Sequence, residues 1–511
     1  MTLAAYNLDF RRVPGAAHIF GAEVNAIEWS ATCRLVRENG GRLVALWGSE
    51  RATEFAVYAA LAAAEGMIVL TLPVSRGNAV YPGIEEIFPA AGRMQRAAHD
   101  LLGLQAQGAE DRRPWLRHGA WPADQFPLRA DFDGAHRHPD GDDDYAFVRV
   151  DGDGVHEIPV GPVHAGTIEP GHFRFSIVGE RVLKLEERLG YKHKGIEKRF
   201  VGMTPAEGAK LAARVSGDST VAYGWAYAMA AEGAGAVVPP PRALWLRALL
   251  LERERIANHL GDLGFLGNDA GLAFGLAQFS CLKEDMLRLN AQLFGHRYLM
   301  DAVVPGGVTH NLTRDGAELI LVEADALDAT VKTLREIYDE HSGLQDRFLA
   351  CGRVTPALAA QLGLCGLAGR ASAQALDLRE QFPVEPYDRL DARMATHRNG
   401  DVAARVSVRF DEIFESLRLV REIVEHMPAG DIRAELPMAG AKFGVGLIEG
   451  WRGEVLVALE TAADGRIARC HAHDPSWLNW PLLEHAVMDN IVPDFPLINK
   501  SFNLSYSGQD L

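Results

Sequence analysis

Helical periodicity dominates the middle of this 511-residue chain. Between Thr204 and Ala350, apolar residues recur at the 3.6-residue spacing of amphipathic helices, as in Leu249-Leu-Leu-Glu-Arg-Glu-Arg-Ile-Ala-Asn-His-Leu260. Short polar connections separate these segments, and long amphipathic helices joined in this way pack as a bundle. The helices are expected at residues 206–232, 242–260, 279–293 and 315–349, the last with a break near 341–343. The sequence therefore predicts a mainly helical domain in this region.

Strand signals flank the helical region on both sides. In the N-terminal part, strands are expected at 43–47 and 67–72 and helices at 30–40 and 93–104, while the Ala-rich stretch 55–66 fits either. In the C-terminal part, a helix at 410–425 precedes expected strands at 441–446, 453–460 and 467–471. The predicted fold class is α+β, with a small α/β N-terminal domain followed by a mainly helical domain with β-rich edges.

The composition changes between Asp131 and Asp144 to Asp, Gly, His and Pro. A stretch with so few apolar residues cannot pack a core, so it is interpreted as a linker. An acidic metal-binding loop is the alternative, although the spacing matches no EF-hand pattern. The predicted domains are residues 1–130, an acidic linker at 131–154, and residues 155–511.

Charge and cysteine usage exclude several classes of function. The net charge of −16 argues against nucleic-acid binding and against direct adsorption to an anionic membrane. The N-terminus lacks the basic and apolar regions of a signal peptide, so a location in the cytoplasm is expected. The five cysteines show no C-x-x-C spacing and predict neither a disulfide framework nor a thiolate metal site.

The final segment, Ser501-Phe-Asn-Leu-Ser-Tyr-Ser-Gly-Gln-Asp-Leu511, interleaves aromatic and apolar residues with polar ones. Chain ends are normally frayed and polar, so a tail of this composition is expected to be docked. Two interpretations stay open from the residues alone. The tail either covers the core or closes a central site.

Two sets of motifs carry a resemblance to known families. The first set is Tyr81-Pro-Gly-Ile, Ile87-Phe-Pro-Ala-Ala91, Asp100-Leu-Leu-Gly103 and Trp121-Pro with Pro127-Leu-Arg129. The second set is Gly161-Pro-Val-His-Ala-Gly-Thr-Ile-Glu-Pro-Gly-His-Phe-Arg174, Tyr191-Lys-His-Lys-Gly-Ile-Glu-Lys198, Glu254-Arg-Ile-Ala-Asn-His259, Pro305-Gly-Gly-Val308 and Arg370-Ala-Ser372. On the first set, residues 1–130 resemble the 30-kilodalton-type subunit of respiratory complex I. On the second, residues from about 155 resemble its 49-kilodalton-type subunit and, more closely, the large subunit of membrane-bound group 4 nickel–iron hydrogenases of the formate hydrogenlyase type.

The resemblance also locates the metal-ligand positions of such hydrogenases, which bind nickel and iron through two C-x-x-C pairs. Here Ser216 and Ser219 stand at the first pair, and Ser505 and Gly508 at the second. A serine hydroxyl is a poor ligand near neutral pH, and glycine has no side chain. No nickel–iron centre and no other bound metal is therefore expected, and the tail is predicted to close a metal-free cavity against residues 214–219.

The resemblance implies which polar residues surround that cavity. Glu169 matches a proton-relaying glutamate, His164 and His172 flank it, and Asp269 matches an aspartate of the complex I quinone site. These four are the candidate catalytic residues; the alternative for the glutamate and the histidines is a structural hydrogen-bonding role. A buried charge network around the cavity is expected from Arg174, Arg214, Arg255, His259 and Arg370.

The function implied is that of a core peripheral-arm subunit in a membrane-associated, complex I-like oxidoreductase. Its cavity would pass electrons from an iron–sulfur cluster in a neighbouring subunit to a quinone or another small acceptor. The complex I residues that contact quinone align with Gly217 and lie near Pro170, so neither is present here. The expected partners are a small iron–sulfur subunit of the complex I 20-kilodalton type and membrane antiporter-like and anchor subunits, on the cytoplasmic side of a bacterial inner membrane. A non-catalytic coupling subunit and an active hydrogenase are the alternatives.

Overall fold

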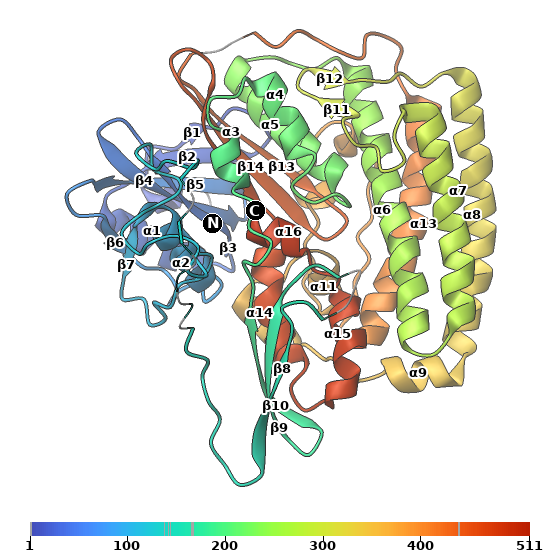
Figure 1. The fold of residues 1–511 in the computed structure, drawn as a ribbon. Coiled ribbons are helices and arrows are strands. Elements are labelled where there is room, and N and C mark those ends of the chain that lie inside the picture. Colours follow the sequence, from blue (N-terminus) through green and yellow to red (C-terminus); the bar gives the residue numbers. More distant parts are fainter. Residues whose placement is uncertain are drawn as a thin grey trace.

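Two parts with different architectures make up the chain (Figure 1). The computed structural model describes residues 3–136, 138–139, 141, 143, 145–164, 168–437 and 440–511. An N-terminal part with a mixed sheet precedes a larger part in which a helical bundle packs beside two antiparallel sheets. The predicted α+β fold class, with a helical second part and β-rich edges, is confirmed.

A five-stranded sheet in the order β1-β2-β5-β4-β3 forms the centre of the N-terminal part. The Ala-rich stretch with an ambiguous pattern is a strand, because it pairs with a neighbour on each side and is almost entirely buried. Asn25 begins the first helix with a capping box closed by Glu28. The elements are β1 (Arg11–Arg12), β2 (Ile19–Glu23), α1 (Ala26–Glu38), β3 (Arg42–Glu50), β4 (Glu54–Ala63), β5 (Gly66–Ser75), β6 (Val80–Pro82), α2 (Ala91–Leu102) and β7 (Gln105–Gln107).

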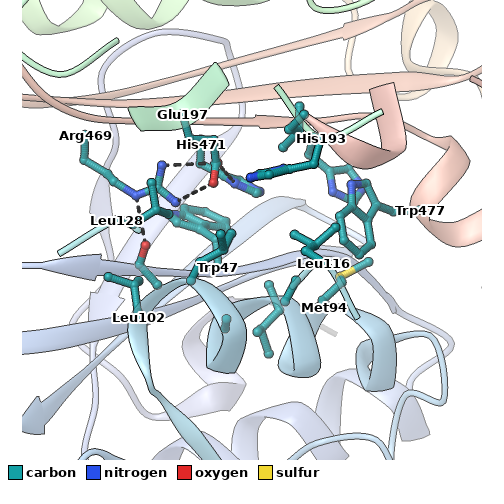
Figure 2. Close-up of a pocket in the computed structure, with 17 residues that line it drawn as sticks. Trp47, Met94, Leu102, Leu116, Leu128, His193, Glu197, Arg469, His471 and Trp477 are labelled. Carbon is teal, nitrogen blue, oxygen red and sulfur yellow. Dashed lines mark hydrogen bonds and ion pairs between the residues drawn. The ribbon is translucent and has the colours of Figure 1, made fainter. Parts of the chain in front are cut away.

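A buried junction joins this sheet to the larger part. Figure 2 shows Trp47 of β3 below His471 of β15 (Ile467–His473), and the two rings stack with centroids 4.9 Å apart. Glu197 of α3 (Ile196–Phe200) accepts a hydrogen bond from His471 at 2.6 Å and forms an ion pair with Arg469 at 3.1 Å. The cavity beside them measures about 30 Å³, room for about one water molecule, so this contact holds the two parts together and offers no ligand site.

The helical bundle follows the predicted periodicity with one important difference. The expected helix 206–232 is divided into α4 (Pro205–Ala212) and α5 (Thr220–Gly235), because the chain turns through 213–219. The predicted break after the long fourth helix is confirmed at His341, whose ring accepts the Leu344 N–H and begins a new helix. The bundle helices are α6 (Pro241–Asp269), α7 (Ala273–Phe294), α8 (Arg314–Glu340), α9 (Ser342–Phe348) and α13 (Val402–His426).

Two three-stranded antiparallel sheets flank the bundle. The first projects as an arm, with strand order β10-β9-β8, and the second packs against α5 in the order β13-β14-β15 (Figure 1). The strands are β8 (Val155–Val160), β9 (His172–Val178), β10 (Arg181–Arg188), β13 (Phe443–Glu449) and β14 (Glu454–Thr461), with β11 (Val303–Val304) and β12 (Gly307–Val308) as a small hairpin. The described residues of the predicted linker form turns and irregular chain before β8.

The C-terminal residues form three helices that the periodicity did not predict. Two of these segments are only eight and five residues long, too short for an apolar period to be recognised, and the third contains Pro481. They pack between the bundle and the projecting arm, and the last of them ends at the buried C-terminus. The helices are α14 (Ser476–Ala486), α15 (Phe495–Phe502) and α16 (Tyr506–Asp510), with α10 (Pro356–Leu362), α11 (Gly366–Ala371) and α12 (Leu378–Gln381) before α13.

Candidate functional site

A surface cleft of about 340 Å³ lies where three segments meet. These are the turn that leads into β9, the loop between α4 and α5, and the end of the chain from α15 onward. The second and third of these segments carry Ser216, Ser219, Ser505 and Gly508, the predicted positions of the degenerate metal site. The lining residues are Ile168, Glu169, Ser216, Gly217, Asp218, Arg452, Lys500, Asn503, Leu504, Ser505, Tyr506 and Ser507.

Ser216 and Ser505 meet at the floor of the cleft. Their hydroxyl oxygens are 2.9 Å apart, so one donates a hydrogen bond to the other. Ser505 is the N-cap of α16, and its hydroxyl accepts the Gly508 N–H at 2.9 Å. All residues from Leu504 to Leu511 are buried. The prediction that the tail is ordered and packed against the 214–219 loop is confirmed.

Asp218 and Arg452 form the adjoining wall. The Arg452 guanidinium bonds both carboxylate oxygens of Asp218, and the Ser216 hydroxyl donates to the same carboxylate at 2.9 Å. Burial opposes ionisation of Asp218, but Arg452 overcomes it and lowers the pKa of this carboxyl to about 2. Arg452 also contacts the Ser219 hydroxyl at 3.2 Å. Ser216, Ser219 and Ser505, three of the four positions that the resemblance matches to metal ligands, are therefore held in one hydrogen-bonded network.

The fourth position, Gly508, faces the carboxylate of Asp474. A Cβ atom added at Gly508 would lie 2.3 Å from Asp474 Oδ2. Asp474 is itself held by the Tyr223 hydroxyl at 2.8 Å and the Ser476 N–H at 2.8 Å, and burial raises its pKa. Three hydroxyls and a glycine do not supply the thiolate donor set of a nickel–iron centre, so these residues do not fit one.

Replacing Gly508 by Cys is expected to lower the free energy of unfolding by about 1–3 kcal/mol, as overpacking typically does. The new side chain displaces Asp474 and breaks its bond to Tyr223. Gly217 offers the matched control in the same cleft, because a Cβ there meets nothing within 4 Å. Urea denaturation of both variants measures the difference, and equal stabilities would contradict the observed packing around Gly508.

Glu169 lies at the mouth of the cleft. Its carboxylate accepts the Ser507 N–H at 3.0 Å and lies 3.7 Å from the Lys192 amine. The Glu169 side chain is 36% exposed, so it contacts both the tail and solvent. The carboxylate therefore bonds the C-terminal segment and lines the cleft, and its role as proton relay or as structural acceptor stays a prediction.

His164 and His172 point toward the projecting arm. The His164 ring packs edge-on against Phe173, and His172 accepts a 3.3 Å hydrogen bond from Arg174. Burial lowers the pKa of both imidazoles. Neither lines the cleft, and residues 165–167 between His164 and Glu169 lie outside the described residues.

Three other predicted residues lie at the surface rather than in the expected buried network. Arg174 pairs with Glu157 at 3.0 Å on the arm. Arg214 forms a two-bond ion pair with Asp301 and is 45% exposed. Asp269 lies exposed at the end of α6. The resemblance placed these residues near the cavity, but Arg174 and Arg214 pair with carboxylates outside the cleft and none of the three residues lines it.

Arg255, His259 and Arg370 are brought together in a fully buried ion cluster behind the cleft. His259 bonds Glu412 at 2.8 Å, and Arg370 bonds Glu412 at 2.7 Å and Glu449 at 2.7 Å. The cluster adjoins the cleft through Trp451, whose indole donates to the Asp218 carbonyl and meets the His259 ring edge-on. The cluster also contains Glu252, Asp377, Arg379 and Tyr387.

The cluster's two central carboxyls titrate differently. Burial opposes ionisation of Glu412, yet Arg370 and His259 hold its pKa well below the usual range. Burial raises the pKa of Glu449 to about 7, and nearby Asp377 contributes to the same shift. A buried arginine cluster that contains a carboxyl with a pKa of about 7 can bind or release a proton without exposing charge to solvent.

Several residues of the cleft and the ion cluster were not predicted from the sequence. Asp218 stands between the two serines and could have been selected by that position alone. Asp474, Glu412 and Arg452 lie in stretches without a recognised motif, and only the fold brings them to the cleft and the cluster. Across the residues that the structure describes, no group of three His, Cys, Asp or Glu side chains is arranged to hold a metal ion. No helix within the described ranges is both long and apolar enough to span a bilayer.

Comparisons with known proteins agree with this architecture. Residues 22–138 match the family described as the respiratory-chain NADH dehydrogenase 30 Kd subunit. Residues 269–443 match the respiratory-chain NADH dehydrogenase 49 Kd subunit. The two matches fall in the N-terminal and larger parts of the fold.

Two relatives and one solved structure extend across most of the chain. Hydrogenase-4 component G of Escherichia coli (strain K12) is 30% identical over 93% of this chain and 85% of its own length. Formate hydrogenlyase subunit 5 of the same organism is 29% identical over 93% of this chain and 86% of its own length. A chain of the membrane-bound sulfane sulfur reductase, an archaeal respiratory membrane complex, has the same fold with a TM-score of 0.66 at 22% identity, covering 70% of this chain and 98% of its own length.

Proposed function

Because this chain belongs to the family of fused complex I-like and hydrogenase subunits that includes hydrogenase-4 component G, we propose that it is the large peripheral-arm subunit of a membrane-associated oxidoreductase. The cleft between Glu169 and Ser216 is the observation that carries this proposal. It combines an acid at its mouth, hydroxyls at its floor and a buried ion cluster behind it, which is the arrangement that a proton-coupled reduction needs.

In the proposed reaction a small acceptor enters the cleft and takes electrons from an iron–sulfur cluster in a neighbouring subunit. A quinone is one candidate, and its reduction to a quinol consumes two electrons and two protons. Glu169 transfers protons between solvent and the acceptor, and the Ser507 hydroxyl, which also lines the cleft, donates a hydrogen bond to the acceptor. The thiolates of a nickel–iron centre are replaced, so no step passes through such a centre.

The rim of the cleft suits a protein partner. Ile168 and Phe265 are large apolar side chains left 44% and 48% exposed near the cleft. Exposed apolar residues beside a polar site are typical of interaction surfaces. The proposed partner there is the small iron–sulfur subunit of the complex I 20-kilodalton type, with antiporter-like and anchor subunits fixing the assembly to the cytoplasmic side of the membrane.

Replacing Glu169 by Gln in the assembled complex is expected to lower acceptor reduction at least tenfold, because loss of a general acid–base typically costs two to four orders of magnitude. Reduction of decylubiquinone by purified complex measures the effect. Glu180 on the exposed tip of the arm provides the control, and Glu180→Gln should keep full activity. Unchanged turnover in the Glu169 variant would contradict the catalytic proposal.

The second candidate is a coupling subunit without a redox reaction of its own. The buried ion cluster favours it, because Glu449 can change charge without any substrate in the cleft. Unchanged turnover in the Glu169 variant, together with lost ion translocation on replacing Glu449, would identify this role. Stoichiometric nickel in the purified complex would instead indicate a hydrogenase.

A further inference from the structure

A second cavity lies behind the cleft and shares part of its wall. It measures about 10 Å³, just enough for one water molecule. Gly217 and Asp218 line both this cavity and the cleft. Because Gly217 has no side chain, and a Cβ atom built there would meet nothing within 4 Å, the wall between the two spaces is thin at this residue. Arg297 and Tyr298 also line the cavity and are 44% and 41% exposed, so it lies between the cleft and the protein surface.

Two carboxyl groups line this cavity, and they differ in their charge. Burial opposes ionisation of Asp218, but Arg452 lowers its pKa to about 2, so this carboxylate stays ionised and takes no part in proton transfer near neutral pH. Glu254, on α6, is 5% exposed, and its carboxyl group accepts the N–H groups of Val221 at 2.6 Å and Ala222 at 3.2 Å. Glu254 lines the inner cavity and not the cleft itself.

Both charge states of Glu254 have support in the structure. Burial raises its pKa to about 8, and the negative charge of Asp218 adds to this shift, so the neutral form is present at pH 7. The two N–H groups belong to the first turn of α5, whose N-terminus favours an anion, and together with Arg255 they stabilise the carboxylate. Arg297 supplies further positive charge at the cavity wall. A carboxyl group balanced in this way can release a proton and take one up again.

We propose that Glu254 is an internal proton donor of the cleft and that the cavity beside it is its inlet from solvent. A proton passes from the surface at Arg297 and Tyr298 to water in the cavity and then to Glu254. From Glu254 a proton crosses the wall at Gly217 to the acceptor in the cleft, and the carboxylate left behind is protonated again through the cavity.

This inference rests on the proposed function and assigns the source of its second proton. Reduction of a quinone to a quinol consumes two electrons and two protons. The electrons come from the neighbouring iron–sulfur cluster. Glu169 supplies one proton from the mouth of the cleft, and Glu254 supplies the other from behind it.

Turnover of the assembled complex with decylubiquinone, measured in H2O and in D2O, tests the proposal. Glu254→Gln should lower kcat at least tenfold, as loss of a proton donor does, and leave KM unchanged because Glu254 does not line the cleft. The ratio of kcat in H2O to kcat in D2O should increase, since proton delivery becomes the slow step. Glu254→Asp keeps an acid at this position and should recover part of kcat and of the original ratio.

Glu232 provides a matched control for the loss of a buried carboxyl. It lies on α5, is also 5% exposed, and bonds Arg247 away from both cavities. Glu232→Gln should leave the isotope ratio as it is in the unmodified complex. A lower kcat for Glu254→Gln with an unchanged isotope ratio would show that Glu254 only supports α5, and unchanged kcat would equally overturn the proposal.

Infrared spectroscopy of the unmodified complex tests the inlet without turnover. The C=O band of the protonated Glu254 carboxyl, assigned by its loss in Glu254→Gln or by its shift in Glu254→Asp, is expected at pH 7. Transfer to D2O should shift this band before the buried backbone amides exchange, because the cavity connects Glu254 to solvent. Absence of the band, or a shift that comes only with exchange of those amides, would overturn the inlet.

The outcomes also separate this inference from the proposed function. If Glu169→Gln lowers turnover while Glu254→Gln changes neither kcat nor the isotope ratio, the proposed function stands and the inlet falls. If Glu254→Gln lowers kcat and raises the isotope ratio while Glu169→Gln keeps full turnover, the inlet stands and the role proposed for Glu169 fails.

Discussion

Replacing Arg370 by Met is expected to lower the free energy of unfolding by about 3–5 kcal/mol, because removing one partner of a buried ion pair leaves charge without compensation. Arg370 is fully buried and donates to Glu412 and Glu449, and it lies 3.7 Å from Asp377. Methionine fills similar volume but supplies neither charge nor donors. Chemical denaturation of the full-length chain measures the loss.

The controls for this prediction come from the same chain. Arg389 is exposed and lies 3.6 Å from Glu385, so Arg389→Met should cost less than about 1 kcal/mol. Adding Glu449→Gln to the Arg370 variant should restore part of the stability, since Arg370 supplies the side-chain hydrogen bond to the Glu449 carboxylate. A loss below about 1 kcal/mol for Arg370→Met, the size expected of an exposed pair, would show that the cluster is not held together as the structure indicates.

Local sequence patterns were sufficient to predict the long elements of this fold. The bundle helices α6, α7 and α8 are long enough for their apolar period to dominate, and the break at His341 coincides with a capping side chain. The division of the expected 206–232 helix could not be predicted from periodicity. The 213–219 turn is set by contacts of Ser216 and Asp218 with Ser505 and Arg452, which lie hundreds of residues away.

Matching motif positions predicted where the candidate site lies. It did not predict which charged side chains enter the site. The serines meet as that alignment indicated, because the tail returns to the α4–α5 loop. The orientation of Arg214 was unpredictable, since a motif position does not say which way a side chain at a helix end will point. Likewise, Asp474 enters the site only because α14 packs beside α16.

Replacing Glu254 by Gln should flatten the dependence of stability on pH between about pH 5 and pH 8. Glu254 is buried beneath the cleft, where it accepts the Val221 N–H at 2.6 Å. Burial raises its pKa to about 8, and Asp218 adds to the shift. The folded protein therefore keeps this proton over a pH range in which the unfolded chain has lost it, so stability falls as pH rises from the unfolded pKa toward 8.

The expected loss of stability follows from the width of the pH range between the unfolded and the folded pKa of Glu254. Each pKa unit corresponds to about 1.4 kcal/mol, so about three units between pH 5 and pH 8 correspond to about 4 kcal/mol of lost stability. Asp510 and Glu449 have pKa values raised to about 7 and act in the same direction, so the variant must be compared with the unmodified protein at each pH.

A loss of stability that is the same at pH 5 and pH 8 does not affect the comparison between the variant and the unmodified protein. The amide group that Glu254→Gln introduces faces the backbone N–H groups of Val221 and Ala222 and costs stability equally at both pH values, whereas the proton-linked loss differs between them. The informative quantity is therefore the difference in free energy of unfolding between pH 5 and pH 8, measured by urea denaturation. That difference should shrink by several kcal/mol in the variant. An unchanged difference would mean that Glu254 is ionised in the folded protein at neutral pH and does not keep its proton in the buried site beside the cleft.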